Sequence, residues 1–64
     1  MAKFSLEFEC DNDAFYEDTC GTIAEILTDL AHKMRDFPID TKEMQLYLYD
    51  TNGNKIGLSK LTED

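Results

Sequence analysis

Two cysteines and one histidine are the residues with the most reactive side chains in this 64-residue chain. Cys10 and Cys20 do not form a C-x-x-C motif, and no histidine lies near them to complete a zinc site. Both fit the apolar positions of the elements predicted below, so we interpret them as buried thiols, with a disulfide or redox pair as the alternative. His32 falls outside the apolar positions of the predicted helix and is expected to be an ordinary surface residue.

A second candidate for chemistry is a run of polar residues that resembles the start of a calcium-binding loop. Asp50, Asn52 and Asn54 match its first three ligand positions, but Lys55 replaces the required glycine and Leu61 the bidentate glutamate. We therefore predict a hairpin turn without a metal. The chain also has no glycine-rich phosphate loop and no spacing that indicates a catalytic triad, so we expect neither a cofactor nor an enzyme.

Negative charge is the most pronounced feature of the composition, with fourteen acids against six bases and a net charge of −8. The stretch from Glu7 to Asp18 contains six acidic residues and no basic residue. They are Glu7, Glu9, Asp11, Asp13, Glu17 and Asp18. Such a field repels nucleic acid and anionic membranes and favours a basic protein surface; a solvated face that keeps the protein soluble is the alternative. No apolar run has transmembrane length or signal-peptide character, which predicts a cytoplasmic protein.

The element that organises the chain is a helix predicted from about Thr19 to Asp36. Its apolar residues recur at three- and four-residue spacings and form one stripe. They are Cys20, Ile23, Ile26, Leu27, Leu30, Ala31 and Met34. Either Asp18 or Thr22 can serve as the N-cap, and Pro38 disfavours helical geometry at the residue before it.

Three strands complete the prediction. The segment from Lys3 to Cys10 alternates between polar and apolar residues and predicts a half-buried strand. The polar stretch from Asp11 to Asp18 predicts a turn in which Phe15 or Tyr16 packs under the helix while the other ring can face water. After a loop from Phe37 to Glu43, Met44–Asp50 predicts the strongest strand. A hairpin over residues 50–54 leads to the last strand, from about Lys55 to Lys60.

The register of this hairpin follows from its loop length. A two-residue loop would divide the apolar residues between both faces of the sheet. A three-residue loop, Thr51–Gly53, pairs Leu48 with Ile56 and Leu46 with Leu58 on the core face and puts Gly53 in a left-handed conformation. We predict this second register, which also sets Tyr49 beside Lys55 and Tyr47 over Gly57.

The predicted architecture is α+β, in the order β-α-β-β, as a single domain over residues 1–64 with one helix on one face of a three-stranded sheet. The strand order stays open. The uncovered face carries Tyr47 and Tyr49, near Ser5, Glu7 and Glu9 of the first strand. Tyrosine is enriched at interfaces, so this face is a candidate contact surface; the alternative is that both tyrosines serve only as strand formers.

Three segments together, FECDNDAF, IAEILTDLAHKM and YDTNGNKIG, resemble short acidic proteins encoded by bacteriophages and prophages. The similarity covers nearly the whole chain, but the stretch between Asp13 and Gly21 and the Phe37–Glu43 loop depart from that group. The resemblance brings no catalytic residue with it. It implies a setting in which small acidic proteins bind and block host CRISPR effectors, restriction enzymes or polymerase, some by presenting carboxylates in place of phosphates.

The leading hypothesis is therefore an anti-CRISPR-like inhibitor that binds a basic host protein involved in nucleic-acid handling, without binding nucleic acid or membrane itself. The predicted contacts are the carboxylates of Glu7, Glu9, Asp11, Asp13, Glu17 and Asp18, with Tyr16, Tyr47 and Tyr49 as anchors. The alternative is a structural or assembly protein that homodimerises through the tyrosine face of the sheet. A small thiol or metal protein is a third hypothesis.

Overall fold

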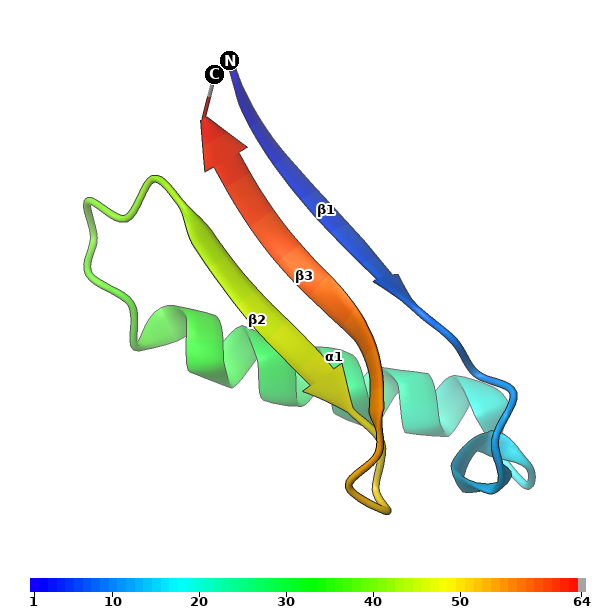
Figure 1. Cartoon of the computed structure of the whole chain (residues 1–64). Coiled ribbons are helices and arrows are strands. Elements are labelled where there is room, and N and C mark those ends of the chain that lie inside the picture. The colour runs from blue at the N-terminus through cyan, green and yellow to red at the C-terminus, as the bar shows by residue number, and fades with distance from the viewer. Residues whose placement is uncertain (64) are drawn as a thin grey trace.

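The computed structural model describes residues 1–63 and has one helix packed against a three-stranded antiparallel sheet (Figure 1). In chain order the elements are β1 (Ala2–Phe8), the short 3-10 helix η1 (Asp13–Phe15), α1 (Thr19–Arg35), β2 (Met44–Tyr49) and β3 (Lys55–Glu63). The sheet order is β1-β3-β2, so the last strand lies between the other two. This confirms the predicted α+β fold and establishes the strand order that the sequence left open.

Helix α1 begins at the earlier of its two predicted starts. Asp18 is the N-cap, and its carboxylate accepts a hydrogen bond from the main-chain N–H of Gly21 at 3.0 Å. The same carboxylate occupies the space that a Cβ at position 21 would need, so glycine in the first turn makes room for the cap. The helix ends at Arg35 with Asp36 as its C-cap, two residues before Pro38, as predicted.

The apolar stripe of α1 is only partly covered by the sheet. Ile26 and Leu30 are buried, and Ile23 and Met34 pack against the same core. The remaining predicted stripe residues, Cys20, Leu27 and Ala31, are exposed. The prediction of two buried thiols is therefore wrong for Cys20, whereas Cys10 is half-buried and packs against the core.

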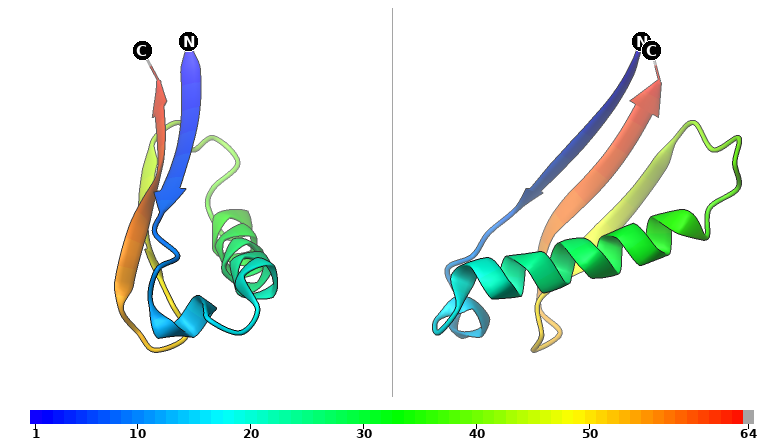
Figure 2. Two further views of the ribbon diagram at one scale, coloured as in Figure 1. Left: turned by 90° about the vertical axis from the view of Figure 1, so that its right-hand side faces the viewer. Right: turned by 180° about the vertical axis from the view of Figure 1, so that it is seen from behind.

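The position of α1 explains this incomplete coverage. Figures 1 and 2 show the helix crossing the half of the sheet that lies nearer the hairpin, so the start of β1 and the end of β3 extend beyond it. Phe8 reaches the core, but Phe4 and Leu6 of the same strand stay exposed. The prediction of a half-buried first strand is thus right at its end and wrong for its first half.

The hairpin register differs from the prediction by one residue beyond the turn. The three-residue loop is confirmed: Asp50 N–H donates to the Asn54 carbonyl at 3.0 Å, and Gly53 has a φ of 86°. Tyr49 pairs with Lys55 as predicted, but a β-bulge at Ile56 then shifts the ladder, so that Leu48 pairs with Gly57.

Beyond the bulge, Leu46 pairs with Ser59 and Tyr47 with Leu58, so the predicted pairings of Leu46 with Leu58 and of Leu48 with Ile56 are wrong. The residue after the bulge is Gly57. The main chain of Glu7 and Phe8 lies so close to it that a side chain at this position would clash, so glycine has to stand there.

The core forms where η1, α1 and β2 meet. Its buried members are Phe15, Ile26, Leu30 and Leu48. Phe8 stacks on Phe15 with ring centroids 6.4 Å apart. Ser59, fully buried in the central strand, donates a hydrogen bond from its hydroxyl to the Leu46 carbonyl at 3.0 Å, which satisfies the buried group. Small residues in the central strand thus leave space for large side chains from both sides.

Candidate functional site

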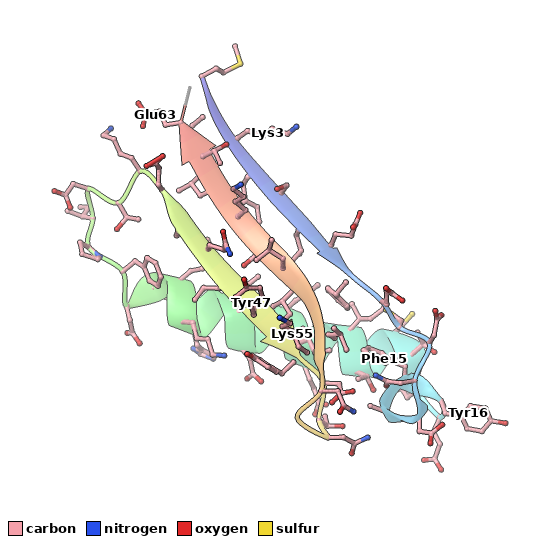
Figure 3. All side chains as sticks on the ribbon, viewed as in Figure 1. Lys3, Phe15, Tyr16, Tyr47, Lys55 and Glu63 are labelled. Carbon is pink, nitrogen blue, oxygen red and sulfur yellow. The ribbon has the colours of Figure 1, made fainter. Side chains whose placement is uncertain are left out.

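The segment between β1 and α1 places two neighbouring aromatic rings in opposite environments, one buried and one exposed. The Asn12 side chain caps η1 by accepting a hydrogen bond from the Ala14 N–H at 3.0 Å. The hydroxyls of Thr19 and Thr22 donate to the carbonyls of Phe15 and Ala14, which ties η1 to the helix. As a result Phe15 points into the core and Tyr16 projects away from the body of the protein (Figure 3).

Tyr16 is 87% exposed and stands among carboxylates. Together with Asp13, Glu17 and Asp18 it lines a shallow hollow of about 320 Å³ beside the first turn of α1. We call these four residues the acidic corner. The ion pair found within residues 1–63 joins Lys42 to Glu63 at 3.9 Å, so none of the three carboxylates in the corner has a basic partner there. An exposed ring beside unpaired carboxylates suits a basic partner surface.

The other predicted acidic residues lie next to the corner without joining it. Glu9 and Asp11 border a second hollow, of about 340 Å³, which also includes Lys55. Glu7 is exposed on β1, where it pairs with Leu58 of β3. The six carboxylates therefore lie along the segment that leads from β1 to the start of α1. Three of them line one hollow together with Tyr16.

Tyr47 and Tyr49 both lie on β2, and the central strand β3 separates them from β1. Tyr47 and Glu7 nevertheless share the uncovered face of the sheet, as predicted, because both pair with Leu58. The ring of Tyr47 is covered by Lys55, whose Nζ lies 4.4 Å from the ring centroid, and its hydroxyl accepts a hydrogen bond from Gln45 at 3.1 Å (Figure 3). Tyr47 lies opposite Leu58, not over Gly57 as predicted.

Tyr49 borders a hollow of about 440 Å³ between the end of β2 and the helix, which includes Glu25 and Asp29. The nine predicted contact residues thus do not form one patch. The acidic corner lies at the start of the helix, whereas Tyr47 and Glu7 lie on the uncovered face of the sheet on either side of Leu58.

The sequence did not reveal the full structural role of Asp50, which joins the hairpin to Asn12, the residue that caps η1. Asp50 is 6% exposed. One of its oxygens accepts hydrogen bonds from the main-chain N–H groups of Asn52 and Asn54, at 2.8 and 2.9 Å. The other accepts from the side-chain amides of Asn12, at 2.6 Å, and Asn54, at 3.3 Å. Because Asn12 also caps η1, Asp50 holds the corner in place.

These hydrogen bonds also set the protonation of Asp50. Burial by itself raises the pKa of this carboxyl, since it disfavours the charged form. The hydrogen bonds from Asn54, Asn52 and Asn12 stabilise the carboxylate, and the net effect is a pKa below the ordinary value. With its oxygens occupied by four donors, Asp50 serves a hairpin and not a cation loop.

Among residues 1–63 no group of three or more histidine, cysteine, aspartate or glutamate side chains is arranged to hold a metal ion. None of the helices in that range has the length and apolar character needed to cross a membrane. Comparisons with protein-family models, with curated protein sequences and with solved structures find no match for this chain. The case for a function therefore rests on the acidic corner itself.

Proposed function

We propose that this protein is a non-enzymatic inhibitor that binds a basic surface of a host nucleic-acid-handling protein through its acidic corner. The observation that carries the proposal is Tyr16, 87% exposed beside three carboxylates that lack basic partners among residues 1–63. Tyrosine is among the residues that most often dominate binding energy, and surrounding carboxylates attract basic partners over a distance. A phage origin, the cytoplasm of the host and an anti-CRISPR activity belong to the same proposal.

The contacts that hold the acidic corner support this role. Phe15 anchors it in the core, Asn12 links it to Asp50, and Asp18 caps the helix. A prefolded contact surface loses little conformational entropy on binding, which favours affinity. Carboxylates held on such a surface can occupy a groove that otherwise receives nucleic-acid phosphates, and the protein would then compete with the nucleic acid.

The test is a pull-down from bacterial lysate with the tagged protein, with elution by rising salt or by duplex DNA and identification by mass spectrometry. We expect a nucleic-acid-handling protein that both salt and DNA release. The test variant carries Asp13→Lys, Glu17→Lys and Asp18→Asn; asparagine keeps the helix cap while it removes the charge. It should lose the captured protein.

A matched control separates the corner from net charge. The control variant carries Asp40→Lys, Glu43→Lys and Asp36→Asn in the segment that follows the helix. Its net charge changes from −8 to −3, as in the test variant. This control should keep the captured protein at low salt. If both variants lose the captured protein equally, binding depends on net charge alone. If both retain it equally, the acidic corner is not the binding surface. Tyr16→Ala should weaken binding to the isolated target by about tenfold or more, whereas Tyr16→Phe keeps most of the contact.

A structural role through self-association is the second candidate, favoured by the partial exposure of Tyr47 and Tyr49 on β2. A dimer formed by this surface should dissociate in a Tyr47→Glu variant, which sedimentation at low concentration measures. An unchanged dimer would exclude the tyrosine surface as its interface.

A further inference from the structure

The outer edge of β1 offers unpaired main-chain groups. Glu9 N–H donates to the Ile56 carbonyl at 3.1 Å, which continues the ladder in which Glu7 pairs with Leu58. In an antiparallel ladder such hydrogen-bonded residues alternate with residues whose N–H and C=O point the other way. The residues that point outward are therefore Ala2, Phe4, Leu6 and Phe8. No strand within residues 1–63 pairs with this edge.

The side chains of β1 add two features to this open edge. Phe4 and Leu6 are 43% and 36% exposed, and their alternation along the strand puts them on the same face of the sheet as Phe8, which packs against the core. Figure 2 shows that the start of β1 extends beyond α1. On the opposite side, Lys3 and Glu7 stand two residues before and two residues after Ser5. The strand thus has opposite charges placed symmetrically about its centre.

We propose that β1 pairs with β1 of a second copy of this chain, antiparallel about a two-fold axis at Ser5. Phe4 then lies opposite Leu6 of the second copy, and the main-chain groups that point outward form the hydrogen bonds. Lys3 lies opposite Glu7 of the second copy at positions where the side chains approach most closely. The result is a continuous six-stranded sheet with both helices on one side.

Charge complementarity favours a second copy as the partner, and the length of strand that is paired selects this register. The axis at Ser5 pairs all residues of Ala2–Phe8 within the strand and forms two opposite-charge pairs. An axis at Phe4 sets Lys3 opposite Ser5 and leaves Glu7 beyond the strand of the partner. An axis at Leu6 also sets opposite charges against each other, Lys3 and Glu9, but it pairs only residues 4–8 of the two β1 strands and places the rest of each strand against residues beyond Phe8. Such an edge invites pairing unless something covers it.

Charge exchange between Lys3 and Glu7 tests the pairing by sedimentation equilibrium. Lys3→Glu or Glu7→Lys turns both attractive pairs of the dimer into repulsive ones, and each should weaken dimerisation by about tenfold. The double exchange should restore it, and a mixture of the two single variants should form a heterodimer. Lys33→Glu, on the helix, changes the charge as Lys3→Glu does and should leave the dimer intact.

Amide hydrogen exchange identifies the surface without a mutation. In the monomer the Ser5 and Glu7 amides bond to β3 and should exchange slowly, whereas the Phe4 and Leu6 amides point outward and should exchange fast. At high concentration all four should become slow. A monomer at all concentrations, a dimer whose Phe4 and Leu6 amides stay fast, or a dimer unaffected by either charge change would overturn the proposal. The acidic corner takes no part in it, so either proposal can fail alone.

Discussion

Phe15 and Tyr16 are adjacent aromatic residues with opposite burial, and replacing each by alanine gives a sharp test of the core. Phe15 is 1% exposed, stacks on Phe8 and belongs to the buried cluster with Ile26 and Leu30, so Phe15→Ala opens a cavity beneath the helix. Deleting a buried phenylalanine ring costs about 3–5 kcal/mol. Tyr16→Ala removes an exposed ring, and its expected effect is within about 0.5 kcal/mol.

The total stability makes this difference easy to observe. At about 0.05–0.15 kcal/mol per residue, a chain of 64 residues has a free energy of unfolding of about 3–10 kcal/mol. Phe15→Ala therefore removes about a third of it or more, and the urea midpoint of the variant should fall well below that of the wild type. Urea titration followed by far-ultraviolet circular dichroism measures both variants. Equal midpoints for Phe15→Ala and Tyr16→Ala would refute the assignment of Phe15 to the core.

Two further variants test the hairpin and the central strand. Because folding lowers the pKa of Asp50, this group stabilises the fold above its unfolded pKa of about 4, and the contribution disappears as the pH falls through the lower folded value. At neutral pH the wild type should have a higher free energy of unfolding than Asp50→Asn, and this difference should shrink in acid. Urea titrations at several pH values measure it. A difference that does not change with pH would contradict the hydrogen-bonded carboxylate. Gly57→Ala should cost about 1–3 kcal/mol, since its methyl group meets the main chain of Glu7 and Phe8. If Gly57→Ala has the same thermal unfolding midpoint as the wild type, the close contact with β1 is contradicted.

Much of the candidate surface could be predicted from the sequence, but the arrangement of its residues in space could not. The run of acids from Glu7 to Asp18 is visible in the chain, and one of Phe15 and Tyr16 was expected to face water. The distance of Tyr47 and Tyr49 from β1 depends on the position of β3 between β1 and β2. The hydrogen bond from Asn12 to Asp50 joins residues 38 positions apart, and neither residue carries a local signal for it.

The sequence by itself determined the local elements. Helix α1, its end before Pro38 and the three-residue turn with Gly53 at a positive φ all follow from periodicity, capping and turn chemistry, which act over a few residues. The tertiary structure decided the strand order, the bulge at Ile56 and the exposure of Phe4 and Leu6. These depend on which surfaces meet: β1 approaches Gly57 too closely for any side chain, and a single helix covers only the half of the sheet it crosses.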